Sequence, residues 1–461
     1  MEMNEWLVIA MFGSFIALLF TGIPVAYVLG GIGIVFAAVG YYADLYLDTF
    51  TGLDYTSIGL VVNRIYQIMD NWILVALPMF IFMGNMLDKS GIAERLMGSM
   101  QQLFGKVHGG LAITVMAIGI ILAASTGIIG ASVVLLTVMS LPTMMKQGYH
   151  LPFALGTVAS AGTLGILLPP SIMLVIMADQ LGLSVGDLFM GAIMPGLLLG
   201  GLYISYMLIL GRLNPHQAPV PDDVQPVDWR LIAQVFRDII PTVILITAVL
   251  GSIFAGIATP TEASGIGAFG ATLLAAYNRK LNLKVIKEVL MASYGTTAYI
   301  FMIFLGASCF ALVLRELGGD ELIESMLSGL PFGPYGIIAF ILFIVFLLGF
   351  FLDWIEITLI ALPLLAPVIA NLGIELDGHG VVDNPSLVWF VMLVAMALQT
   401  SFLTPPVGFA LFYLKGVCPE GVTLKQIYRG VVPFIMIQLL ALACLVAWPQ
   451  LVLWFPSVAY G

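Results

Sequence analysis

Two double prolines fall within apolar stretches that otherwise favour helix. One lies in GTLGILLPPSIMLVI at 162–176, and the other in TSFLTPPVGFALF at 400–412. Proline has no N–H to donate and clashes with the carbonyl four residues earlier, so each pair breaks the helix and should free two carbonyls from helical bonding. The carbonyls concerned belong to Gly165, Ile166, Ser401 and Phe402.

Such breaks can bind ions. Carbonyl oxygens that point into a dry cavity suit a small cation such as Na⁺, and the half-helix that begins after each break presents a positive dipole end that suits a carboxylate. Hydroxyl ligands could come from Thr163, Ser401 and Thr404. The alternative is that the prolines only kink two buried helices. Two pairs in equivalent places, each preceded by small or hydroxyl residues, favour a binding site.

Two short segments between apolar runs could form the other wall of this site. The segment 125–132 (STGIIGAS) offers small residues that let the backbone approach a ligand, although they could serve only tight packing. The segment 351–356 (FLDWIE) places acidic groups near the membrane interior, where a carboxylate is usually functional. Its Asp353 could ligate a cation or cap the helix that follows. The predicted substrate-binding residues are Thr126, Gly127, Ser132, Thr163, Pro169, Asp353 and Pro405.

The composition shows which kind of protein must position these residues. Of the 461 residues, 61% are hydrophobic and 9% are charged, against about 25% charged in soluble domains. We therefore expect an all-α polytopic membrane protein. The 16 Lys and Arg against 26 Asp and Glu argue against nucleic-acid binding. We find no nucleophile–base set, P-loop or dinucleotide-binding loop, so we expect neither an enzyme nor an organic cofactor.

The apolar runs predict about ten membrane spans and two re-entrant hairpins. The hairpin arms are four short runs, 110–124 with 130–145 and 334–350 with 357–371, whereas a full span needs about 20 residues. Reading the arms as four ordinary spans gives the same loop parity, so charge alone leaves both interpretations open. The short arms favour hairpins.

The basic residues predict the orientation. Of 16 Lys and Arg, all but Arg64 and Arg315 fall in loops on one face, which is then cytoplasmic. Both termini would lie outside the cytoplasm. The segment 211–238, rich in Pro and Asp, reads as a cytoplasmic linker, and 283–292 reads as an amphipathic surface helix.

The order of motifs repeats in the two halves of the chain. A span ending near glycine (80–84; 302–306) precedes a hairpin, a double-proline helix and a closing helix. An odd number of spans separates the copies, so the second is inverted. Inverted repeats with discontinuous helices are typical of secondary transporters that bind substrate at the membrane midplane.

Four motifs, in this order along nearly the whole chain, resemble the large membrane subunit (DctM-like) of tripartite ATP-independent periplasmic (TRAP) transporters, in the longer-chain branch of that family. They are FTGIPVAY (20–27), LGILLPPSIMLVI (164–176), GIATPTEAS (256–264) and SFLTPPVGFALFYL (401–414). The resemblance implies an elevator-type symporter of sodium ions and an organic acid in the bacterial inner membrane. It also implies two partners, a small four-span membrane subunit and a periplasmic substrate-binding protein. Since no four-span segment precedes residue 1, we expect the small subunit to be a separate chain.

The resemblance also assigns sites and domains. It places sodium ligands at Gly165, Leu168, Pro170, Ser401, Thr404 and Val407, and a second-hairpin aspartate at Asp353. At the first hairpin tip, Ile128 and Ile129 replace two serines of many relatives, so backbone carbonyls would have to serve there. The expected division is scaffold helices (1–109), transport-domain half 1 (110–182), scaffold helices with the linker (183–333), transport-domain half 2 (334–415) and a C-terminal scaffold helix (416–461). A stand-alone sodium/dicarboxylate symporter of similar architecture remains the alternative.

Overall fold

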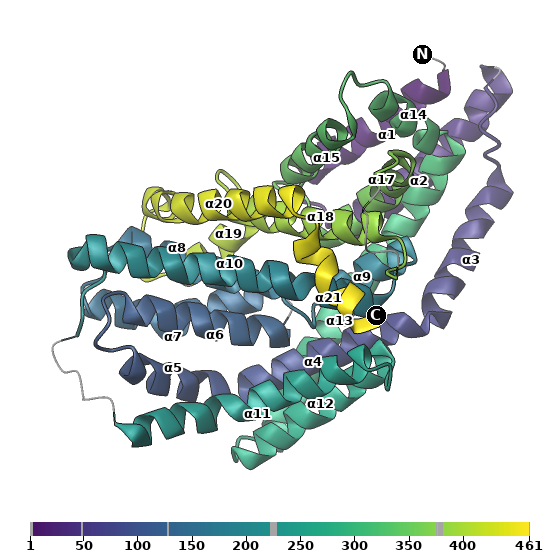
Figure 1. Ribbon diagram of the computed structural model, residues 1–461. Helices are drawn as coiled ribbons and strands as arrows, with labels where there is room; N and C mark the ends of the chain where they lie inside the picture. Colours follow the sequence, from purple (N-terminus) through teal and green to yellow (C-terminus); the bar gives the residue numbers. More distant parts are fainter. Residues whose placement is uncertain are drawn as a thin grey trace.

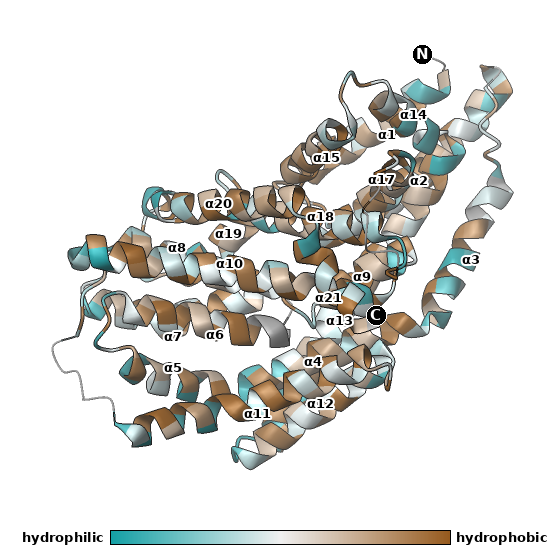
Figure 2. Cartoon of the chain, in the orientation of Figure 1, coloured by the Kyte–Doolittle hydropathy of each residue, from teal (hydrophilic) through white to brown (hydrophobic). Residues whose placement is uncertain are grey.

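The computed structural model describes residues 3–47, 49–126, 129–221, 228–374, 376 and 381–460. Within these ranges the chain is helical, with no strand, and nine helices are long and apolar enough to cross a membrane. Hydrophobic residues run along the middle of the helices, and hydrophilic residues gather at helix ends and loops (Figure 2). The chain is therefore an all-helical polytopic membrane protein, as its composition predicts.

One packing group contains most of the first hundred residues and the segment after the linker (Figure 1). Within it α2 packs on α13, α4 packs on α12 and α13, and α11 packs on α5 and α12. The elements of this group are α1 (Met3–Leu19), α2 (Val25–Tyr46), α3 (Tyr55–Asp70), η1 (Trp72–Val75), α4 (Ala76–Lys89), α5 (Ile92–Leu103), α11 (Trp229–Phe254), α12 (Pro260–Tyr277), α13 (Leu283–Glu316) and α14 (Gly319–Ser328).

A second packing group surrounds the two double prolines. Its centre is formed by α8 and α18, which contact each other and carry the hairpin helices on their flanks. The elements are α6 (Gly110–Thr126), α7 (Ile129–Lys146), α8 (Leu151–Thr163), η2 (Leu164–Ile166), α9 (Ile172–Leu181), α10 (Val185–Leu213), η3 (Pro215–Gln217), α15 (Pro334–Leu348), α16 (Trp354–Glu356), η4 (Ile357–Ala361), α17 (Leu362–Asn371), α18 (Pro385–Leu403), α19 (Phe409–Val417), α20 (Leu424–Ala447) and α21 (Gln450–Tyr460).

Helices α8 and α20 cross at a pair of glycines. A Cβ atom on Gly156 would lie 2.1 Å from the Gly430 carbonyl oxygen, and one on Gly430 would lie 2.0 Å from the carbonyl oxygen of Pro152. Only glycine permits this approach of the two backbones, a device that membrane helices use widely. Helices α10 and α20, which we predict to be scaffold helices, thus pack on the broken-helix group. The division into scaffold and transport domain stays a prediction.

The described helices match the predicted apolar runs and add three short helices in the loops, α3, α5 and α14. The start of α3 is set by Asp54, whose carboxylate accepts hydrogen bonds from Thr56 and Ser57 that hold its pKa below the ordinary value. The surface helix predicted at 283–292 is the first part of α13, because no proline interrupts the chain before the span. Part of the predicted linker is helical as well, since α11 begins at Trp229.

Candidate functional site

The first double proline interrupts a helix in the most buried part of the molecule. Helix α8 tightens into the 3₁₀ turn η2, the chain leaves helical geometry from Leu167 to Ser171, and α9 begins at Ile172. The Pro169–Pro170 peptide bond is cis. The predicted sodium residues Gly165, Leu168 and Pro170 all lie in this buried stretch. Leu168 and Pro170 have apolar side chains, so their contribution to a cation site would be the backbone carbonyl.

The Ile166 carbonyl accepts no helical N–H, as predicted, but it has another hydrogen-bond partner. The Ser171 hydroxyl donates to its carbonyl oxygen at 2.6 Å and so replaces the missing helical N–H. The reason is the general need of buried polar groups for a partner. A carbonyl oxygen has two lone pairs, so it can still face a cation. Thr163 is buried, and its hydroxyl donates to the Ser160 carbonyl at 2.9 Å.

The second double proline forms the matching break. Helix α18 ends at Leu403, the Pro405–Pro406 peptide bond is cis, and α19 begins at Phe409 after Gly408. Here the prediction of a free carbonyl is wrong for Ser401, because its oxygen accepts the N–H of Thr404 at 3.0 Å. The residues of this second break, Thr404 to Val407, are half-buried or exposed, whereas those of the first break are buried.

Two hydroxyls and one backbone carbonyl bring oxygen atoms to this second break. The Ser401 hydroxyl donates to the Phe346 carbonyl at 2.8 Å. This bond connects α18 to α15, the first arm of the second predicted hairpin. The Thr404 hydroxyl donates to the Thr400 carbonyl at 2.6 Å. Because each hydroxyl donates its hydrogen bond to a carbonyl, the lone pairs of its oxygen remain available to a cation. Val407, the third predicted sodium residue of this half, is half-buried in the break and can offer its carbonyl.

An amide on α18 was missed by the sequence analysis. Gln399 is fully buried, and neither its Oε1 nor its Nε2 has a hydrogen-bond partner among the described residues. Counting back from the double prolines, Gln399 stands where Thr163 stands in the first half. A buried amide without a partner is costly unless a ligand or water satisfies it. The signal was present in the sequence, since this amide interrupts the apolar run from Leu387 to Leu398.

The first hairpin clamps the first broken helix. Its arms α6 and α7 contact each other and both contact α8. A Cβ atom on Gly162 would lie 2.4 Å from Val133 Cγ2 and 2.8 Å from Val133 Cα, so α7 touches the broken helix backbone just before its break. At the hairpin tip, Gly127 and the side chain of Thr126 lie outside the described residues. Ser132 is buried in α7.

The tip of the second hairpin carries two carboxylates. Asp353 is half-buried and accepts the Trp354 N–H at 2.8 Å, so it caps α16, the second of the two roles considered for it. Glu356 is 1% exposed, and its Oε2 has no hydrogen-bond partner among the described residues. The π-helical turn η4 follows directly, a form that occurs often at functional sites. Glu356 is therefore a functional candidate.

Two tyrosines accompany these carboxylates. Tyr299 of α13 lies within electrostatic range of Glu356, Asp353 and Tyr413. Tyr413 of α19 lies within range of Asp353 and packs its ring on Gly130 of the first hairpin. No local pattern in the sequence relates these two tyrosines to the carboxylates, because four separate helices bring the residues together.

Each hairpin contacts the broken helix of the other half. Helix α19 packs on the first hairpin arm α7, while α9 packs on η4, α16 and α17 of the second hairpin. Helix α18 also contacts η2, so the two breaks belong to one region. The arrangement can present carbonyl and hydroxyl oxygens to cations and two helix N-termini to an anion. Among the described residues, no group of three His, Cys, Asp or Glu could hold a metal ion by side chains alone.

Comparison with known proteins identifies relatives along nearly the whole chain. The family model described as the tripartite ATP-independent periplasmic transporter, DctM component, matches residues 12–451. The C4-dicarboxylate TRAP transporter large permease protein DctM of Pseudomonas aeruginosa is 30% identical over 402 residues, which cover 87% of this chain and 90% of that protein. The sialic acid TRAP transporter large permease protein SiaM of Vibrio cholerae is 26% identical and is covered to 98%, with 97% of this chain.

A solved structure shares the fold. The YdaH transporter of Alcanivorax borkumensis superposes with a TM-score of 0.60 over 85% of this chain and 87% of that one, at 12% sequence identity. The family match confirms the resemblance read from the sequence motifs; it does not resolve the longer-chain branch. The chain belongs to the DctM family, the large permease subunits of bacterial TRAP transporters, which are multi-pass membrane permeases and not enzymes.

Proposed function

We propose that this chain couples the uptake of an organic acid to the entry of sodium ions, as the large subunit of a three-component transporter. The observation that carries the proposal is the pair of matched breaks, at Pro169–Pro170 and Pro405–Pro406, each flanked by backbone and hydroxyl oxygens. Sodium coupling would use carbonyls at the two breaks, joined by the hydroxyls of Ser401 and Thr404. Gly165, Leu168, Pro170 and Val407 are the remaining proposed ligands.

The proposed substrate is a carboxylate between the two breaks. The first turns of α9 and α19 begin directly after the breaks and present N–H groups and positive dipole ends. The wall opposite would be the hairpin tips, with Thr126, Gly127, Ser132 and Asp353. Relatives named for C4-dicarboxylate, sialic acid and isethionate transport support an acidic substrate.

We further propose that the broken-helix group moves as a unit across the scaffold, in an elevator-type mechanism. Its support is the dense packing within the broken-helix group, exemplified by the close approach of α7 to α8 at Gly162. A small four-span subunit and a periplasmic substrate-binding protein are the proposed partners, on the ground that the chain belongs to the TRAP family.

The test is uptake by proteoliposomes that contain the chain, its small subunit and its binding protein. Labelled succinate, sialic acid and isethionate serve as probes. We expect uptake of one of them that requires an inward sodium gradient, proceeds without ATP and stops when either partner is omitted. Equal uptake in potassium-only buffer would contradict sodium coupling. Uptake by the chain alone would instead establish a stand-alone symporter.

A further inference from the structure

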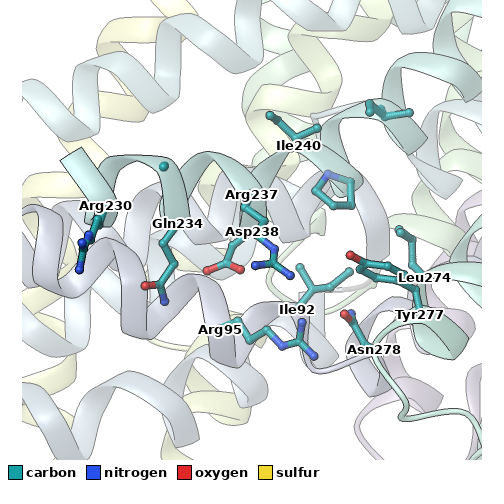
Figure 3. Close-up of a pocket in the computed structure, with 13 residues that line it drawn as sticks. Ile92, Arg95, Arg230, Gln234, Arg237, Asp238, Ile240, Leu274, Tyr277 and Asn278 are labelled. Carbon is teal, nitrogen blue, oxygen red and sulfur yellow. The ribbon is translucent and has the colours of Figure 1, made fainter. Parts of the chain in front are cut away.

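A pocket of about 980 Å³ opens between α5, α11 and α12, away from the two breaks. Three arginines line it, Arg95 from α5 and Arg230 and Arg237 from α11, together with one carboxylate, Asp238 (Figure 3). Three cations and one anion leave two net positive charges at the pocket. Arg95, Arg230 and Arg237 belong to segments that the sequence predicts to lie on the cytoplasmic face.

The arginines are not engaged elsewhere. None of the three forms an ion pair with another described residue; the ion pairs among described residues are Lys89–Glu288 and Arg315–Asp320. Asp238 Oδ2 is buried in the pocket wall and has no hydrogen-bond partner among the described residues. Unpaired guanidinium groups around a cavity suit a phosphate, which they can bind through two parallel hydrogen bonds.

The other side of the pocket is apolar. Along α11 the lining residues change from Arg230, Gln234 and Arg237 to Ile240 and Ile244 within four turns. Ile240 is 47% exposed and Ile244 is 61% exposed, so an apolar strip continues from the arginines along α11. Trp229 at the start of α11 is 75% exposed, and tryptophan is a residue type enriched at membrane–water interfaces.

We propose that this pocket binds the headgroup of an anionic phospholipid. The arginines would hold the phosphate, the isoleucines of α11 would line an acyl chain, and Asp238 would accept a hydrogen bond from a headgroup hydroxyl, such as those of phosphatidylglycerol. Basic pockets between membrane helices on the cytoplasmic side bind anionic headgroups in this way. A soluble phosphate lacks the acyl chain, so it would leave the apolar strip empty. A partner helix would leave the arginines unneutralised unless it brought acidic residues.

The test measures lipid binding to the purified full-length chain by native mass spectrometry, with phosphatidylglycerol and phosphatidylcholine as probes. The variant Arg95→Gln/Arg237→Gln removes two phosphate ligands. The matched control, Lys284→Gln/Lys287→Gln, removes two exposed cations from the start of the next helix, α13, which do not line the pocket. We expect phosphatidylglycerol to bind the parent and the control alike, and the arginine variant about 30-fold more weakly. This change equals about 2 kcal/mol, near the value for two basic residues at a membrane surface.

Several outcomes would overturn the proposal. Equal binding of both lipids, or equal binding by the arginine variant, would show that the pocket does not recognise the anionic headgroup. Inorganic phosphate or glycerol 3-phosphate that displaces the lipid at similar concentrations would establish a soluble phosphate site. Loss of the lipid on assembly with the small subunit would make the pocket a protein interface. Thermal unfolding of each variant verifies that the compared proteins are folded.

Discussion

The hydroxyl of Thr404 donates to the Thr400 carbonyl, so its oxygen lone pairs point away from the helix at the second break. If they ligate sodium, Thr404→Val keeps the shape and removes one ligand. Loss of such an interaction in a dry site costs about 1–3 kcal/mol, or about five- to 150-fold in sodium affinity. Sodium titration of uptake should show a raised half-maximal concentration.

The matched control is Thr404→Ser, which keeps the oxygen and should keep the parent's sodium dependence. A purely structural Thr404 would behave differently. Thr404→Val would then lower the amount or thermal stability of folded protein, while the half-maximal sodium concentration of the surviving protein stayed at the parent value.

Glu356 should show opposite effects on stability and on transport. Its buried carboxylate has an unpartnered Oε2, and an uncompensated buried charge destabilises a fold. We expect Glu356→Gln to raise the melting temperature and to reduce uptake severely, because an ionisable carboxyl beside the proposed substrate region is lost. Exposed Glu321→Gln on α14 is the control and should change neither quantity. Full uptake by Glu356→Gln would remove this residue from the transport site.

At the scale of elements, the first hairpin and the first broken helix depend on Gly162. A Cβ there would lie 2.8 Å from Val133 Cα, which is backbone and cannot rotate away. We expect Gly162→Ala to separate α7 from α8 at a cost of about 1–3 kcal/mol, the usual range for overpacking. Thermal unfolding of the purified protein measures it.

Gly201 on α10 is the matched control, because a Cβ there meets nothing within 4 Å. Gly201→Ala should keep or slightly raise the unfolding temperature, because alanine favours a helix more than glycine does. A Gly162→Ala protein as stable as the parent would show that the α7–α8 contact can open without loss, and would weaken the case for a rigid hairpin clamp.

The sequence predicted the broken helices and the helices of the two predicted hairpins because their causes are local. That these helix pairs re-enter the membrane stays a prediction. Proline chemistry and the lengths of the apolar runs act within a few residues. The sequence missed what depends on distant partners. The Ser171 hydroxyl and the Ile166 carbonyl are only five residues apart in the sequence. Their hydrogen bond depends on the path of the chain through the break, which the sequence does not specify. The grouping of Tyr299 and Tyr413 with Glu356 arises from the packing of separate helices.

At the scale of the whole molecule, the distribution of Lys and Arg predicts which face is cytoplasmic. His216, exposed within the predicted linker, and Asp383, exposed before α18, should lie on opposite sides. Each is replaced by cysteine in a variant whose native cysteines are changed to alanine. Membrane-impermeant maleimide should label His216→Cys from the cytoplasm only and Asp383→Cys from outside only. The reverse pattern would invert the predicted orientation.

The contacts of each hairpin with the broken helix of the other half bear on ion stoichiometry. An ion that orders the first break steadies α9, and with it η4 and α16 near the second break; an ion at the second break steadies α19 and, through it, α7. When one ion has already ordered these helices, the next ion binds with a smaller loss of conformational entropy. This is positive cooperativity through conformational entropy. Thermodynamic linkage requires the effect to be reciprocal. Sodium activation curves should therefore be sigmoidal, with a Hill coefficient above one, and a defect at either break should flatten them.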